Sequence, residues 1–433
     1  MEQEKTWTLP VVDMNSEGVG VCKQDGMVVF VPGAVTGDVI EVTLTGKQKN
    51  YATGVCRQVL TPVQARMEPD CPFYTQCGGC TLRHITREME LTVKENTVRQ
   101  ALRRLHLTSA EGDVRPILSS TEYGYRNKAV FHFDKTGAVG YYARESHNVL
   151  PGSANCRLLP PLFGEIAAFT EQWQWQRIPV SLYLRCTEKG DCTVSIQTKE
   201  GWQKTDRAGL RAYAGALRSR FPAVIGVLHS DSPTGKYAVP QYTVVEGERY
   251  LHEVYGGLTM RISPEGFCQV NKRGAEQLAE TVLAFAQTEG PVRAADLYCG
   301  SGFFGLQLAK AYPDWQLYGI EISEDSIRDA QVNLLENGLT NIHFRAGDAA
   351  IAGEGYDVVV IDPPRAGCSD KMRQQLLTMA PKKIVYVSCN PQTLARDLAA
   401  MVQGGYRLDA VQPVDMFPRT EHVECVVLMS RKD

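Results

Sequence analysis

The sequence predicts an α/β protein of three parts, the last of which is a Rossmann-like, doubly wound parallel sheet. Short Val-rich runs separated by turn pairs occupy residues 1–61, and a mixed α+β segment follows at 62–250. From 251 to 433, strand-like and helix-like runs alternate, which is typical of a parallel sheet covered by helices. The length of 433 residues fits roughly three domains at ~150 residues each.

The first part is expected to be a small, OB-like closed β-barrel. Asp25 and Gly26 form a hairpin turn pair between two Val-rich runs. About five short strands are typical of such a barrel, with or without a nucleic-acid-binding role, and the pattern does not separate these two readings. The expected strands are 6–13, 20–22, 27–31, 39–43 and 52–59.

The central part combines one clear helix with scattered strands. Leu91, Val98 and Leu102 recur at helical spacing within a helix expected at 86–105. The expected strands of this part are 129–133, 181–185, 193–198 and 224–230.

The third part alternates buried strands with amphipathic helices. The strands are expected at 292–298, 316–321, 342–346, 356–361 and 383–387. The helices are expected at 305–311, 326–337, 371–379 and 393–403. This order predicts a parallel, doubly wound sheet, in which ligands bind at the carboxyl ends of the strands.

Composition excludes several classes of protein. Hydrophobic residues make up 43% and charged residues 22%, which is ordinary for a globular chain and excludes wholesale disorder or a coiled-coil rod. The net charge of −3 excludes a chain-wide basic coat but not a local basic patch. No apolar run reaches the ~18 residues of a membrane span, and the amino terminus lacks the apolar stretch of a secretory signal. A cytoplasmic protein with no membrane association and no stable protein partner is expected. Its thirteen cysteines are then unlikely to form a disulfide framework.

A glycine-rich turn predicts a nucleotide-type site. Gly300, Gly302 and Gly305 form GxGxxG between a strand and a helix, and Glu321 ends the next strand. Glycines let the backbone approach a ligand, and the acid can hold ribose hydroxyls. The alternative is a purely structural tight turn.

Two further strand ends favour S-adenosylmethionine over a nicotinamide cofactor. Asp348 follows the third strand, where a carboxylate can accept from an adenine amino group, and Asp362 with Pro363 follows the fourth. So acidic a pocket suits a positive sulfonium better than a pyrophosphate. Asp362 has the alternative of a helix N-cap or turn former.

Cys389 and Glu424 are the candidate nucleophile and base. Cys389 follows the fifth strand, so its thiol faces the same crevice as Asp362. Glu424 precedes the apolar run 426–429, and a carboxylate entering a buried strand is a candidate base with a raised pKa. The alternatives are that the Cys389 thiol is inert and that Glu424 is an exposed carboxylate at the start of a strand.

Five strings in the carboxyl-terminal part together resemble the RNA uracil-5 methyltransferase family. They are FCQVN at 267–271, DLYCG at 296–300, DPPRAG at 362–367, SCNP at 388–391 and HVEC at 422–425. The resemblance implies that Cys389 is the nucleophile and that Glu424 removes the proton from carbon 5 of uracil. It further implies that S-adenosylmethionine is contacted by the residues that match the family's cofactor positions, to which Asp348 is added. Those positions are Gln269, Tyr298, Glu321 and Asp362.

This reaction explains the residue types. Carbon 5 of uracil is a poor nucleophile until a thiolate adds at carbon 6, so covalent catalysis splits one hard step into easier ones. A base must then remove the carbon 5 proton, and the target base must leave the RNA stack.

A cysteine cluster predicts a metal site. Cys71, Cys77 and Cys80 have the spacing C-x5-C-x2-C, and Cys156 is the best fourth ligand. Four thiolates suit either zinc or an iron–sulfur cluster, and unliganded thiols are the alternative. The resemblance implies a [4Fe–4S] cluster, as in the ribosomal RNA members of the family.

RNA is the expected partner. The segment 123–128 mixes aromatic and cationic residues, which suits unstacked bases and phosphates. The amino-terminal barrel resembles the RNA-binding TRAM module, which with the cysteine cluster points to 23S ribosomal RNA. A transfer RNA substrate is the first alternative. An NAD-dependent dehydrogenase leaves Asp362 and Cys389 unexplained, and a non-catalytic RNA-binding protein would transfer no methyl group.

Overall fold

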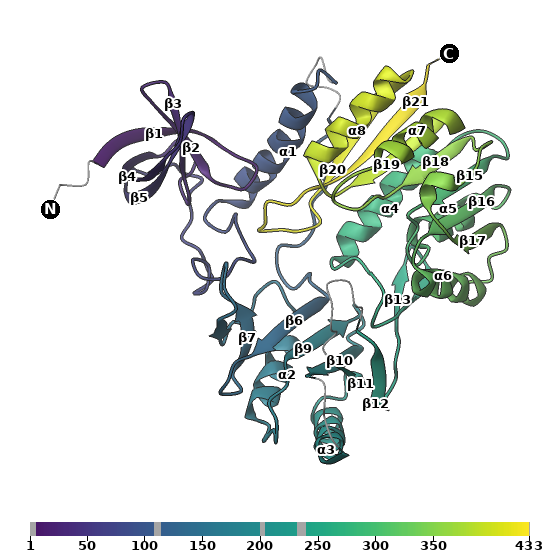
Figure 1. Cartoon of the computed structure of the whole chain (residues 1–433), viewed down its shortest axis with the longest axis horizontal. Helices are drawn as coiled ribbons and strands as arrows, with labels where there is room; N and C mark the ends of the chain where they lie inside the picture. Colours follow the sequence, from purple (N-terminus) through teal and green to yellow (C-terminus); the bar gives the residue numbers. More distant parts are fainter. Residues whose placement is uncertain (1–5, 108–113, 200–203, 232–239, 433) are drawn as a thin grey trace.

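The computed structural model describes residues 6–107, 114–199, 204–231 and 240–432 as three lobes around a central junction (Figure 1). Residues 1–5, part of the amino-terminal stretch in which no secretory signal is expected, lie outside the described residues. Within those ranges, no helix is both long and apolar enough to cross a membrane.

The first lobe is the expected five-stranded closed barrel, in the order β1-β2-β3-β5-β4. Its interior is filled by alternating apolar side chains such as Leu9, Val29 and Ile40. Asp25 and Gly26 both have positive φ, as the predicted hairpin turn requires. Its strands are β1 (Thr6–Met14), β2 (Gly20–Gln24), β3 (Met27–Val31), β4 (Val39–Lys47) and β5 (Tyr51–Thr61).

The central lobe is a seven-stranded sheet in the order β12-β11-β10-β9-β6-β7-β8. Its strands are β6 (Lys128–Phe133), β7 (Val139–Tyr142), β8 (Val149–Pro151), β9 (Ser181–Cys186), β10 (Cys192–Thr198), β11 (Val224–Asp231) and β12 (Tyr242–Gly247). Helices α2 (Pro161–Gln172) and α3 (Lys204–Arg220) complete it; the sequence pattern did not predict them.

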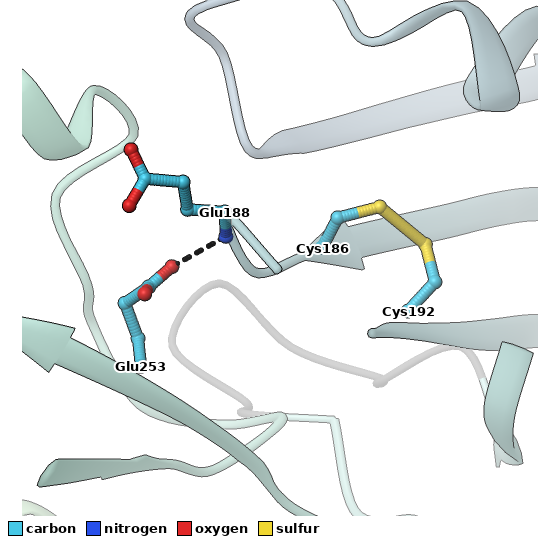
Figure 2. The surroundings of a disulfide bond; sticks show 4 residues. All are labelled: Cys186, Glu188, Cys192 and Glu253. Carbon is cyan, nitrogen blue, oxygen red and sulfur yellow. Dashed lines mark hydrogen bonds between the residues drawn. A yellow bond between two sulfur atoms is a disulfide. The ribbon is translucent and has the colours of Figure 1, made fainter. Parts of the chain in front are cut away.

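A disulfide joins Cys186 and Cys192, which face each other across the β9–β10 hairpin with their Cα atoms 4.2 Å apart (Figure 2). The sequence analysis gave this pair no role. The turn beyond it reaches the third lobe, because the Glu188 N–H donates to a Glu253 carboxylate oxygen at 2.7 Å.

The third lobe contains the doubly wound sheet, in the order β17-β16-β15-β18-β19-β21-β20. Its first five strands are parallel, as predicted, and β21 and β20 close one edge in antiparallel pairing. The strands are β15 (Arg293–Leu297), β16 (Gln316–Glu321), β17 (Ile342–Ala346), β18 (Val358–Ile361), β19 (Lys383–Ser388), β20 (Tyr406–Val414) and β21 (Glu424–Arg431). The covering elements are α4 (Lys272–Ala286), α5 (Phe303–Ala311), α6 (Glu324–Glu336), α7 (Asp370–Met379), α8 (Pro391–Gln403) and the short η2 (Ala349–Ile351), and the hairpin of β13 (Leu251–Tyr255) and β14 (Leu258–Ile262) precedes them.

Helix α1 (Arg87–Arg103) joins the lobes, because it packs beside α8 on the third lobe (Figure 1). Val98 and Leu102 of α1 belong to the same apolar core as the strands β18 and β19. On the same helix, the wholly buried Lys94 ammonium pairs with Glu90 at 3.0 Å and with Asp415 at 2.5 Å. Apolar burial and a buried ion pair therefore both bind α1 to the third lobe.

Candidate active site

The site lies where the strand order reverses between β15 and β18. Helices follow these two strands onto opposite faces of the sheet, so a crevice opens at their carboxyl ends. The turn after β15, the turn after β18 and the turn after β19 all reach this crevice.

The glycine-rich turn after β15 requires its glycines. Gly300 and Gly302 have φ of 53° and 87°, and Tyr298 also has a positive φ of 63°. A Cβ at Gly305 would stand 2.7 Å from Ile342 and 2.9 Å from Asp296. The Gly305 N–H instead donates to the buried Asp296 carboxylate at 2.7 Å, which holds α5 tightly against the sheet.

Three of the five predicted cofactor residues line one cavity. Gln269, Tyr298 and Asp362 face it from three separate segments, together with Gly300 and Phe303 of the glycine-rich turn. Burial raises the pKa of Asp362 to about 7 and that of Tyr298 to about 12.

Glu321 and Asp348 are not among the residues that line this cavity, although the charges of both act on Tyr298. The two carboxylate oxygens of Glu321 accept from the Gly300 N–H at 3.2 Å and the Ser323 N–H at 2.9 Å, which fixes the side chain beside the glycine turn. Asp348 is exposed, caps η2 and pairs with Lys371 at 2.9 Å. The hydrogen bond from Lys371 lowers the pKa of Asp348. Asp348 therefore already has a structural role, besides the predicted contact to adenine.

Strand pairing brings the candidate nucleophile and base together. Ser388 pairs with Cys425 between the antiparallel strands β19 and β21, so the next position places Cys389 opposite Glu424. Burial raises the pKa of the half-buried Cys389 thiol to about 11; the charges of Glu424 and Asp362 add to this, and Arg365 opposes it. Burial, with the nearby Asp362, raises the pKa of Glu424 to about 8, so this side chain is a candidate base with a shifted pKa, as predicted.

Arg365 and His422 also belong to this site, although the sequence analysis gave them no role. The exposed Arg365 guanidinium lies 3.3 Å from His422 Nδ1, and its charge acts on both Cys389 and Glu424. The carbonyl of Arg365 accepts from the Thr393 hydroxyl at 3.2 Å, which ties the turn after β18 to α8. Arg365 lies in the string DPPRAG and His422 in the string HVEC, so the sequence shows where they stand along the chain. It does not show the effect of the Arg365 charge on Cys389 and Glu424.

All four predicted metal ligands line a second cavity of about 920 Å³ in the central lobe. Cys71, Cys77 and Cys80 come from the loop before α1, and Cys156 comes from the segment after β8. Among the described residues, no three His, Cys, Asp or Glu side chains lie close enough to hold a single metal ion. The cavity is also lined by Arg83, Arg126, Lys128, Arg144 and Arg157.

The segment expected to contact RNA is only partly open. Tyr123 is exposed, with the Arg157 guanidinium 4.3 Å from its ring centre. Tyr125 is buried and donates to the Pro418 carbonyl at 3.0 Å, so its ring is not accessible to a base.

The crevice thus offers a thiol, two carboxyl groups with raised pKa values and a cavity that can hold a cofactor beside them. Such a set supports nucleophilic addition followed by proton removal.

Comparison with known proteins agrees with this chemistry. The family model described as tRNA (Uracil-5-)-methyltransferase matches residues 344–432, and the Methyltransferase small domain model matches 270–385. An RNA methyltransferase of Bacillus cereus is 33% identical, with 99% of this chain and 97% of that protein covered. One of Gloeobacter violaceus is 34% identical at the same coverage. The solved Pyrococcus abyssi tRNA (uracil-54, C5)-methyltransferase, in complex with S-adenosyl-L-homocysteine, shares the fold with a TM-score of 0.77 at 24% identity. That similarity covers 98% of this chain and 100% of the solved chain.

Proposed function

This chain belongs to the RNA uracil-5 methyltransferase family and is an RNA (uracil-5-)-methyltransferase that uses S-adenosylmethionine, and we propose that it methylates carbon 5 of a uridine in 23S ribosomal RNA through a covalent Cys389–uracil adduct. The proposal of this adduct rests on one observation: Cys389, Glu424 and Asp362 lie close together at the carboxyl ends of β18 and β19.

The acidic crevice fits the proposed cofactor. Asp362 lines the cavity with Gln269 and Tyr298, and Glu321 is fixed beside the glycine-rich turn by two backbone N–H groups. S-adenosylmethionine supplies a methyl group on a positive sulfonium, whose charge is complementary to these carboxylates.

In the proposed first step, the Cys389 thiolate adds to carbon 6 of the flipped uracil. The new carbon–sulfur bond pushes the electrons of the ring double bond towards carbon 5 and the 4-oxygen, so carbon 5 becomes the nucleophile that takes the methyl group. The methyl–sulfur bond of the sulfonium would break in the same step, and its electrons would stay on the sulfur of the departing S-adenosylhomocysteine. Arg365 lowers the pKa of Cys389, against the effects of burial and the two carboxylates, and so favours the thiolate.

In the second step, the Glu424 carboxylate removes the proton from carbon 5. The electrons of that carbon–hydrogen bond restore the ring double bond and expel the Cys389 thiolate, which frees the methylated base. The position of Glu424 opposite Cys389 supports this division of roles, because the proposed proton acceptor and the proposed leaving sulfur are then neighbours across two paired strands.

The RNA class is the finer part of this proposal. The barrel of residues 6–61 and the cysteine pattern resemble the ribosomal RNA members of the family. The Pyrococcus abyssi enzyme acts on tRNA and shares the fold along nearly the whole chain, so tRNA is the second candidate.

The test supplies labelled S-adenosylmethionine with unmodified 23S ribosomal RNA and, separately, with unmodified tRNA transcripts. We expect 5-methyluridine in the ribosomal RNA, lost in Cys389→Ala and retained in Cys56→Ala, a half-buried cysteine of the barrel. Label that appears only in the tRNA would identify tRNA, in place of ribosomal RNA, as the substrate. Absence of label from both RNAs would overturn the proposal.

We further infer that Cys71, Cys77, Cys80 and Cys156 hold a [4Fe–4S] cluster. Their common cavity supports it, because it brings the four thiols together from two separate segments of the chain. The surrounding arginines would balance the negative charge of four thiolates. Anaerobically purified protein should contain iron and acid-labile sulfide, lost in Cys80→Ser but not in Cys56→Ser. Zinc without iron would contradict the cluster.

A further inference from the structure

A short strap, residues 120–127, touches two functional regions at the junction of the lobes. At one end the Asn271 amide donates to the Ser120 hydroxyl at 2.8 Å. Near the other end, the Arg126 N–H donates to the Leu158 carbonyl, two residues beyond Cys156, at 2.9 Å. The strap therefore lies between the cysteine cavity and the segment 267–271, which carries Gln269.

Asn127, the last residue of the strap, makes a two-point contact with that segment. Its backbone N–H donates to the Val270 carbonyl at 2.9 Å, and its side-chain Nδ2 donates to the Gln269 carbonyl at 3.0 Å. The preceding residue extends the contact, because Arg126 and Asn271 form an antiparallel β-bridge. Three consecutive residues of the segment are thus held by two residues of the strap.

Asn127 is itself held from the other side. Its carbonyl accepts from the Cys186 N–H at 2.9 Å, at the end of strand β9 where the disulfide closes the hairpin. Its Oδ1 is buried and has no partner among the described residues. The residue therefore has a fixed backbone, and its Nδ2 is the side-chain atom that acts on the cofactor segment.

We propose that Asn127 is a positioning residue that sets the orientation of Gln269 in the cofactor cavity. The segment 267–271 is a loop between β14 and α4, with Phe267 71% exposed, so it needs external contacts to hold one conformation. A loop fixed before binding loses less conformational freedom when the ligand arrives, and the affinity rises accordingly. This inference rests on the proposed contact between Gln269 and S-adenosylmethionine.

The experiment measures S-adenosylhomocysteine binding to the full chain by titration calorimetry. Asn127→Ala removes the Nδ2 donor, and we expect the Kd to rise about tenfold, as for the loss of one net hydrogen bond. Asn127→Ser retains a shorter donor and should fall between Asn127→Ala and the wild type. Asn148→Ala, an exposed asparagine of the same lobe, is the matched control and should bind like the wild type.

Amide hydrogen exchange without ligand gives a second, independent measurement. Peptides covering 267–271 should exchange faster in Asn127→Ala, whereas peptides from β9 should keep their wild-type rate. Unchanged affinity together with unchanged exchange in 267–271 would overturn the positioning role. If the wild type itself binds no S-adenosylhomocysteine, the proposed cofactor site fails instead, and the exchange experiment still decides whether Asn127 orders the loop.

Discussion

Replacing Glu424 by glutamine should change how the stability of the protein depends on pH. Glu424 is 6% exposed, and the pKa of its carboxyl group is raised from 4.5 to about 8, chiefly by burial. Between these values the unfolded chain has released this proton while the folded protein still holds it. The wild type must therefore lose stability as the pH rises from about 4.5 to about 8, and the contribution is complete at lower pH.

The size of the effect follows from the two pKa values. At about 1.4 kcal/mol for each pH unit between them, the loss from pH 5 to pH 9 is of the order of 4 kcal/mol. Glu424→Gln has nearly the same shape and no ionisable group, so this loss disappears. For a domain of the size of the third lobe, about 4 kcal/mol corresponds to a difference of roughly 8–16 °C in Tm.

The assay is thermal unfolding of the wild type and Glu424→Gln at pH 5 and pH 9. The two Tm values should be close at pH 5, and the variant should be clearly more stable at pH 9. Glu280→Gln, which alters an exposed carboxylate of α4, is the control and should follow the wild type. If the wild type and Glu424→Gln show the same pH dependence, Glu424 is not a buried acid with a raised pKa.

In the presence of RNA and cofactor, the same variant should accumulate a covalent protein–RNA adduct, because carbon 5 keeps its proton.

Three other changes test the site and its support. Cys389→Ala should reduce methyl transfer by at least about 10³-fold while S-adenosylhomocysteine binds as in the wild type; normal turnover would remove Cys389 from the reaction. The rate of transfer should rise between pH 7 and pH 9, because Cys389 and Glu424, with pKa values of about 11 and about 8, must both lose a proton; a flat profile from single-turnover kinetics would contradict this. Lys94→Met should destabilise the protein, because it removes the wholly buried cation that bridges Asp415 and Glu90. Arg87 still pairs with both carboxylates, so the cost should stay below the roughly 3–5 kcal/mol of a buried charge left fully unpaired. Lys47→Met on the barrel surface should leave the Tm unchanged.

The sequence predicts the doubly wound sheet well, because buried parallel strands are continuous apolar runs that end at functional residues. The five predicted strands of this sheet all form, and their ends place Tyr298, Asp362 and Cys389 at one crevice. The position of Asp362 and Cys389 was predictable because each follows a strand of a parallel sheet, whose carboxyl ends meet at one crevice; their roles stay predictions.

What the sequence does not predict depends on contacts between distant segments. The charge of Arg365 acts on Cys389 and Glu424 only because three strand ends converge, and no spacing along the chain encodes that. Cys186 and Cys192 pair because β9 and β10 have the register that places them opposite each other. In the sequence, Asn127 belongs to a segment expected to contact RNA. Only the packing of the lobes at their junction brings its side chain to the Gln269 carbonyl.

The attachment of α1 to the third lobe limits how this protein can be divided. Although α1 precedes the catalytic sheet by about 190 residues of chain, its apolar face and Lys94 complete the far side of that sheet. A fragment that starts at residue 251 would expose this face and would leave Asp415 without a counterion, so it would aggregate rather than fold. Chimaeras between relatives should therefore exchange the barrel ahead of α1 and keep α1 with the catalytic sheet of the same parent.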